Sequence, residues 1–188
     1  MYKFISLIFL SLLCSKILNA EIIKKIEITG NQRVSDETII IYGEINKNQD
    51  YTENDLNKIL GNLYSTNFFE DVKVSILGST LKINLKEYPI INQLTILGEK
   101  SNKFKEQIED IISTKEKKSF IKSLLSKDIE LIKNMYSSAG YNFTKVEAKV
   151  NELNNEKLDL IIDIDRGSKT KISSIEFIGN NYIRSNRL

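Results

Sequence analysis

One short sequence occurs three times along the chain and decides the fold. The first copy is Lys25-Ile26-Glu27-Ile28-Thr29-Gly30-Asn31, and the last is Ser174-Ile175-Glu176-Phe177-Ile178-Gly179-Asn180. Between them lies a looser copy, Gln93-Leu94-Thr95-Ile96-Leu97-Gly98. Each copy alternates apolar and polar residues and then meets a glycine, which predicts a strand that runs into a turn suited to glycine. The spacing of the glycines indicates a repeated unit of roughly 70 to 80 residues.

The rest of the first unit predicts two helices. A hydroxyl and two acids at Ser35-Asp36-Glu37 are typical of a helix start, and residues 39–41 continue that short helix. Thr52-Glu53-Asn54-Asp55 resembles a capping box for a second helix. Its apolar residues recur at helical spacing on one face, at Leu56, Ile59, Leu60 and Leu63. Asn67 stands where a left-handed residue would end the helix.

Two alternating strands complete the first unit, one at residues 72–76 and one at residues 81–85, with Gly78-Ser79 as the turn between them. The second unit repeats this order. Its helices are expected around residues 104–112 and 125–136, joined by a solvated connection at residues 115–118. Alternating strands at 146–150 and 158–164 follow, with a turn at Asn154-Asn155. The fold class is therefore α+β, in β-α-α-β-β units whose sheet is covered on one face by two helices.

The first 20 residues are typical of a secretory signal peptide. Lys3 gives a positive start, residues 4–13 are almost entirely apolar, and Ala20 is a small residue before a charged sequence. About ten apolar residues are too few for a membrane anchor, which needs roughly twenty. A lipoprotein site at Cys14 lacks the small residue expected directly before the cysteine.

Composition excludes several classes of function. The chain has no His, and its one Cys lies in the signal segment, so Ser-His and Cys-His nucleophiles and His or Cys zinc sites are excluded. Loss of Lys3 and Lys16 lowers the 27 basic residues to 25, which face 25 acidic ones. A neutral chain is not typical of a nucleic-acid binder. We therefore expect no enzyme activity, no cofactor and no nucleic-acid partner.

These units resemble the POTRA (polypeptide-transport-associated) domain. The markers are Gly30-Asn31-Gln32-Arg33-Val34-Ser35 and Leu63-Tyr64-Ser65-Thr66-Asn67-Phe68-Phe69-Glu70-Asp71-Val72, with matches at Met135-Tyr136, Gly140-Tyr141 and Val146. Among POTRA proteins, the chain is most similar to the BamA family of outer-membrane protein assembly factors. The junctions at residues 88–92 and 165–170 carry this likeness. Two residues depart from the pattern, since Asn67 replaces the usual Gly and Glu99 stands where the other copies have Asn.

The resemblance implies tandem POTRA domains, each with a three-stranded mixed sheet. The expected division is a signal peptide at 1–20, a first domain at 21–89, a second at 90–167 and the truncated start of a third at 168–188. The family's later POTRA domains and membrane barrel do not fit in this chain, so any membrane contact is expected only through such a barrel. The expected location is the periplasmic face of the outer membrane.

Exposed strand edges are the predicted binding sites, because an edge can pair with an extended segment largely independently of its sequence. In the family's topology the edge strands here carry Asp71, Val72, Lys73, Val74, Ser75, Ile76, Lys145, Val146, Glu147, Ala148, Lys149 and Val150. The expected partners are unfolded outer-membrane proteins, periplasmic chaperones and assembly-complex lipoproteins. Edge lysines favour the opposite interpretation, an edge that is solvated and protected by charge.

Other interpretations stay open at this point. The same region could belong to a two-partner secretion or autotransporter-assembly pore, or to a free periplasmic holdase. Asp163 and Asp165 share one strand face but lack the further oxygen ligands of a calcium site. Phe68 and Phe69 could form a recognition patch, although packing of Phe69 under the helices and of Phe68 over a helix end is favoured.

Overall fold

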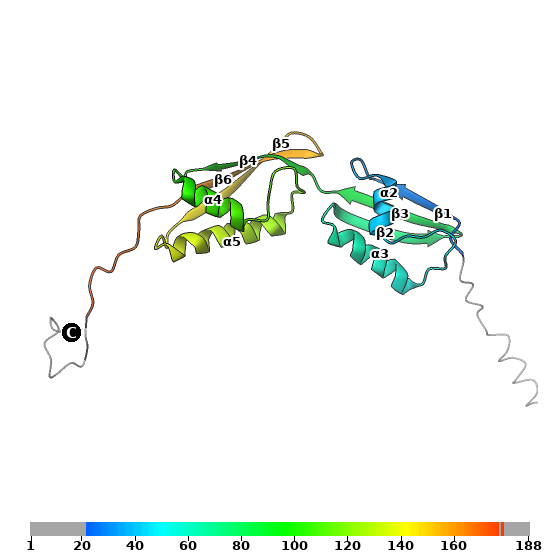
Figure 1. The fold of residues 1–188 in the computed structure, drawn as a ribbon, viewed down its shortest axis with the longest axis horizontal. Helices are drawn as coiled ribbons and strands as arrows, with labels where there is room; N and C mark the ends of the chain where they lie inside the picture. The colour runs from blue at the N-terminus through cyan, green and yellow to red at the C-terminus, as the bar shows by residue number, and fades with distance from the viewer. Residues whose placement is uncertain (1–21, 177, 179–188) are drawn as a thin grey trace, which may run out of the picture. The chain divides into compact units, whose positions relative to one another are not determined.

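The structure, a computed structural model, describes residues 22–176 and residue 178. The chain divides between Glu87 and Tyr88 into two compact units, called unit 1 and unit 2 below (Figure 1). Unit 1 consists of β1 (Lys25–Thr29), α2 (Asp36–Tyr42), α3 (Glu53–Ser65), β2 (Phe69–Leu77) and β3 (Thr80–Glu87). Unit 2 consists of β4 (Ile90–Leu97), α4 (Asn102–Ile111), α5 (Lys122–Ser138), β5 (Lys145–Glu152) and β6 (Lys157–Asp165). The predicted signal peptide lies outside the described residues.

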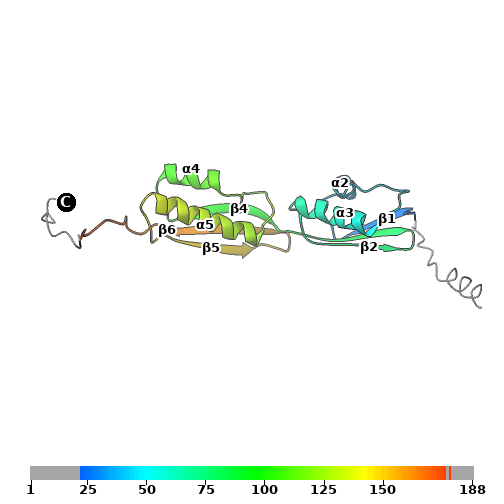
Figure 2. The ribbon, with the colours of Figure 1, turned by 90° about the horizontal axis from the view of Figure 1, so that it is seen from below.

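Each unit contains a three-stranded mixed sheet. The strand order is β1-β3-β2 in unit 1 and β4-β6-β5 in unit 2. The central strand pairs in parallel with the first strand of its unit and antiparallel with its hairpin partner. Within each unit both helices lie on one face of the sheet (Figure 2). The predicted β-α-α-β-β fold class is thus confirmed.

The helix and turn signals in the sequence of unit 1 act as expected. The Ser35 side chain accepts a hydrogen bond from the Thr38 amide at the start of α2. Thr52 and Asp55 form a complete capping box at the start of α3, satisfying two amides that a helix start leaves unpaired. Asn67 has a φ of 58°, so it adopts the left-handed conformation predicted for it.

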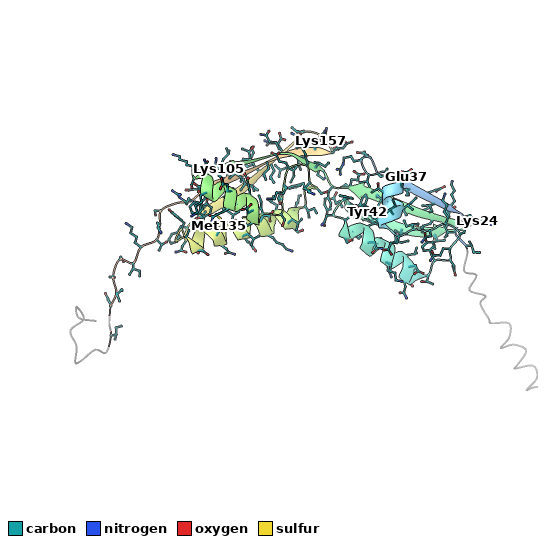
Figure 3. The ribbon with its side chains drawn as sticks, viewed as in Figure 1. Lys24, Glu37, Tyr42, Lys105, Met135 and Lys157 are labelled. Carbon is teal, nitrogen blue, oxygen red and sulfur yellow. The ribbon has the colours of Figure 1, made fainter. Side chains whose placement is uncertain are left out.

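Each unit has a hydrophobic core of its own between sheet and helices. In unit 1 the largest fully buried side chain is Phe69, and in unit 2 it is Tyr136. Phe68 is half-buried, and its ring meets that of Tyr42 edge to face with the centroids 6.0 Å apart. Tyr42 lies at the end of α2 (Figure 3). Phe69 therefore packs in the core and Phe68 covers the helix end, which is the arrangement favoured from the sequence.

The repeated glycines are required by close backbone contact. Gly30 has a φ of 88° and Gly98 a φ of 80°. A Cβ atom at either position would lie 1.9 Å from a carbonyl oxygen of the central strand, that of Leu85 or of Ile164. Gly179, the third copy, lies outside the described residues. Residues 168–176, the described part of the third repeat, contain neither helix nor strand.

Among the described residues, no helix has both the length and the apolar character needed to cross a membrane.

Candidate strand-pairing edges

β2 and β5 are edge strands, because each pairs with the central strand of its sheet on one side only. The predicted residues 71–76 therefore lie along the edge of unit 1, and residues 145–150 lie along the edge of unit 2. Binding at these residues stays a prediction. An edge strand offers unpaired backbone groups at every second residue only, so the strand register decides which residues can act.

The hairpin turn sets the register of β2. Gly78-Ser79 is a two-residue turn, and its positive φ at Gly78 alone fits the type II′ turn that favours glycine first. Leu77 and Thr80 then form the first hydrogen-bonded pair of the ladder, and every second residue from Leu77 bonds inward to β3. The backbone groups of Val72, Val74 and Ile76 consequently point outward.

The same reasoning applies to β5. The Leu153 amide donates to the Lys157 carbonyl at 3.0 Å, so this pair is bonded and the alternation runs back from it. The outward backbone groups belong to Val146, Ala148 and Val150. Their side chains face the helices and are buried, half-buried and exposed in that order. No register shift interrupts the pairing of β5 with β6, so this edge is regular over its length.

Two of the edge lysines form ion pairs with acids of their own sheet. Lys73 lies 3.3 Å from Asp71 on its own strand, and Lys149 bonds Asp163 of the central strand at 3.2 Å. Asp163, which could have been half of a carboxylate pair, is thereby engaged by Lys149. Within the described residues no cluster of three or more acidic side chains could hold a metal ion.

The opposite edge of each sheet is partly closed by the loop between the two helices. In unit 1 the Ile23 amide donates to the Gln49 carbonyl, and its carbonyl accepts from the Asn48 amide. In unit 2 the Ile91 amide donates to the Lys118 carbonyl, and its carbonyl accepts from the Lys117 amide. The two units thus close the start of β1 and of β4 by the same pair of bonds.

The predicted solvated connection at residues 115–118 takes part in this closure. Their side chains are largely exposed, as predicted, but the backbone of Lys117 and Lys118 bonds Ile91, and an isolated bridge joins Ile90 to Ser119. Glu116 also accepts a hydrogen bond from the Leu94 amide at 2.9 Å, which occupies the next outward donor of β4. The charged side chains of residues 115–118 predicted exposure to solvent, but they give no sign of the backbone hydrogen bonds to β4.

A second feature of each unit is a clasp between the loop after the first strand and the end of the central strand. In unit 1 Glu87 is the acceptor: one carboxylate oxygen takes the amides of Gln32, Arg33 and Val34 at 2.9, 3.0 and 3.0 Å. The other oxygen lies 2.9 Å from the Arg33 Nε. Burial alone would raise the pKa of Glu87, but the three amides and the guanidinium outweigh it and hold that pKa below 4.5.

In unit 2 an ion pair joins the same loop to the end of the central strand, with the charges exchanged. The position of Glu87 is taken by Arg166, and the acid is now Glu99 in the loop, which is 6% exposed. Glu99 accepts from the Tyr136 hydroxyl and the Ser101 amide and lies 3.8 Å from Arg166, whose guanidinium stacks on the Tyr141 ring. Burial would raise the pKa of Glu99, but these partners outweigh it and lower the pKa. Glu99 thus replaces the Asn of the other copies because it is the acidic partner of Arg166 in unit 2.

Comparison with known proteins identifies both units. Residues 22–88 match the family model described as POTRA domain, FtsQ-type, and residues 89–167 match the model described as POTRA, surface antigen variable number repeat. The chain is 28% identical over 169 residues to the outer membrane protein assembly factor BamA of Neisseria meningitidis, covering 88% of this chain and 21% of that protein. The chain is a tandem of POTRA domains of the BamA family. The resemblance inferred from the sequence is confirmed.

A second curated relative and one solved structure are also similar to this chain. BamA of Neorickettsia risticii is 25% identical over 174 residues, covering 93% of this chain and 23% of that protein. The N-terminal domain of Omp85 from Thermosynechococcus elongatus has a TM-score of 0.49 at 16% identity, covering 84% of this chain and 73% of that one. The chain spans about a fifth to a quarter of the length of the curated relatives it matches.

Proposed function

We propose that this POTRA pair is a periplasmic scaffold of an outer-membrane β-barrel assembly factor. It binds extended segments of unfolded barrel proteins, and of accessory subunits, by strand pairing at the outward residues of β2 and β5. The chain reaches the periplasm after cleavage of the signal peptide at residues 1–20. Its relatives are named as outer-membrane protein assembly factors, which supports the class of client and the location.

The observation that carries this proposal is the open edge of β5. Among the described residues, none donates to or accepts from the outward backbone groups of Val146, Ala148 and Val150. By contrast, the opposite edge of the same sheet, formed by β4, is occupied at Ile91 and at the Leu94 amide. Unit 2 therefore offers one long strand edge for pairing, in line with the way extended peptides add to exposed sheet edges.

The side chains along this edge fit clients with alternating sequences. The residues with outward backbone groups turn apolar side chains toward the helix side of the sheet, and the residues between them turn charged side chains toward the open face. A paired strand would continue both faces, with apolar residues on the helix side and polar residues on the other. Strands of membrane barrels alternate in this way over about ten residues, and share little else.

The test uses proline at a position where only the outward donor is lost. Ala148→Pro in the whole chain removes the outward amide of residue 148 but no bond to β6, which is the situation in which an edge strand tolerates proline. Ala148→Val is the matched control, because it changes the side chain and keeps the donor. The probe is a peptide of about ten alternating valine and threonine residues, the length of a barrel strand.

We expect the peptide to shift the backbone NMR resonances of β5 in the parent chain and in Ala148→Val. We expect Ala148→Pro to lose most of the binding while its β4–β6 amides stay protected from exchange. A copy of the peptide with two adjacent N-methylated residues at its centre should not bind, because neither of its edges can pair there. Equal binding by Ala148→Pro, or by the methylated peptide, would exclude strand pairing at this edge.

A further inference from the structure

The edge of unit 1 differs from that of unit 2 at Tyr64, in the last turn of α3. The Tyr64 hydroxyl accepts a hydrogen bond from the Val72 amide at 3.1 Å and lies 3.5 Å from an Asp71 carboxylate oxygen, to which it can donate. Val72 is the first of the three outward residues of β2. Its outward donor is therefore already occupied by a side chain of the protein itself.

The strand before Val72 is irregular as well. Phe69 pairs with Glu87 and Asp71 with Lys86, so Glu70 is an extra residue that forms a bulge. A bulge interrupts pairing and twists an edge away from an incoming strand. Together, the bulge and the Tyr64 hydroxyl leave Val74 and Ile76 as the residues of β2 with both outward groups open.

Unit 2 has no equivalent of this tyrosine. Asn67 and Gly140 are the left-handed residues that follow α3 and α5, and three residues before them stand Tyr64 and Ser137. The Ser137 hydroxyl is directed to Asn142 at 2.8 Å, and within the described residues nothing bonds to the outward amide of Val146. The edge of β5 therefore begins one outward residue earlier than the edge of β2.

We propose that Tyr64 is a register-setting residue: its hydroxyl weakens pairing of an incoming strand beyond Val74 and so makes unit 1 the shorter of the two pairing sites. This inference rests on the proposed function, because it concerns the same edges. A strand that continued to Val72 could bond its open carbonyl, but it could bond the amide only by displacing the Tyr64 hydroxyl. At Val146 both outward groups are open, so the same extension there gains one hydrogen bond more than it does at Val72.

The first experiment tests the hydrogen bond from the Val72 amide to the Tyr64 hydroxyl without any ligand. In the parent chain the Val72 amide should exchange with solvent more slowly than the outward amide of Val74. In Tyr64→Phe the two should exchange alike. Tyr51→Phe is the matched control, since its hydroxyl also bonds backbone groups of unit 1, at Asn46, but lies away from the edge. Fast exchange of Val72 in the parent chain would overturn the proposal.

The second experiment adds the valine–threonine peptide described above to the same variants. Tyr64→Phe should bind it at β2 about fivefold more tightly, the effect of about one ordinary hydrogen bond, and the amide resonance of Val72 should shift only in this variant. Binding of the parent chain at β2 with no change in Tyr64→Phe would refute the role of Tyr64. No binding at β2 or β5 in any variant would instead refute the proposed function. The exchange experiment would then still decide whether the Tyr64 hydroxyl occupies the Val72 amide.

Discussion

The clasp of unit 1 leads to a quantitative prediction for Glu87→Gln. The Glu87 side chain is 7% exposed and serves three amides and Arg33 at the same time. Glutamine keeps the size but carries one oxygen and one NH2 group. Whichever way the amide is turned, its NH2 group faces a donor, either the loop amides or the guanidinium. Hydrogen bonds to a charged group are worth about 1.5–3 kcal/mol each against about 1 for neutral ones, so we expect unit 1 to lose about 2–3 kcal/mol of stability.

Native-state hydrogen exchange is the appropriate assay, because it reports on the two units separately in one chain. A loss of about 2–3 kcal/mol lowers the protection of the β1–β3 core amides by about 30- to 160-fold, at 1.36 kcal/mol for each factor of ten. The amides of β4–β6 should not change.

Glu70→Gln is the matched control in the same sheet. It removes an exposed ion pair with Lys86, at 2.7 Å, and exposed pairs contribute little to stability. If Glu87→Gln lowers protection in β1–β3 no further than Glu70→Gln does, the clasp contributes nothing and the reasoning is wrong.

The pH dependence has a definite sign. Since the folded pKa of Glu87 lies below its ordinary value of 4.5, its charged form is favoured by folding. The stability that it contributes is complete above 4.5 and is lost as the pH falls through the folded pKa. Protection of unit 1 should therefore fall in acid in the parent chain, and Glu87→Gln should show less of this fall.

Three other changes test the remaining structure. Gly98→Ala should destabilise unit 2 by more than about 2 kcal/mol, through strain and backbone collision, whereas Gly61→Ala, inside α3 with open space around it, should stabilise unit 1 by about 0.5–1 kcal/mol. Asp128→Asn should lower protection in unit 2, because this buried carboxylate accepts two amides at 2.8 Å. Burial, with Glu99 beside it, raises the pKa of Tyr136 above 10.0, so this tyrosine should resist ionisation in alkali until unit 2 unfolds.

Each of these has a clear contrary outcome. Equal effects of the two glycine variants on thermal unfolding would contradict the role of the left-handed turn. Asp110 is an exposed acid on α4, and Asp110→Asn is the control for Asp128→Asn. Equal amide exchange of unit 2 in both variants would contradict the role of the two amide hydrogen bonds to Asp128. If an absorbance titration showed all tyrosines of the native chain ionising together, it would contradict the raised pKa of Tyr136. Comparison with Tyr136→Phe identifies the ionisation step that belongs to Tyr136.

Much of the fold could be predicted because its signals are local. The caps at Ser35 and Thr52 involve residues three positions apart, and the turn at Gly78 depends on two residues. The alternation of apolar residues identifies which face of each strand is buried. These rules act within one helix turn or one strand, so reading along the chain is enough to find them, and the repeat supplies a second example of each.

The loop and edge contacts could not be predicted, because they join residues that are distant in sequence or depend on the register of a strand. Glu87 bonds an amide 55 positions away, and Lys117 bonds Ile91 through the backbone, without any side-chain signal. The bond from Val72 to Tyr64 spans only eight positions, but it depends on the register of β2. Even so, Glu99 was visible as a departure from the repeat, and its opposite charge to Arg166 was a usable sign of contact.

The exchanged charges of the two clasps have a further consequence for a chain built of similar repeats. Tandem units of one fold can exchange equivalent elements during folding. If the loop of unit 1 docked on the central strand of unit 2, Arg33 would meet Arg166. In the converse exchange Glu99 would meet Glu87. Each correct clasp joins opposite charges, whereas each exchanged clasp would bring like charges together, which is unfavourable. The inversion of charge between the repeats therefore favours the pairing of each loop with the central strand of its own unit.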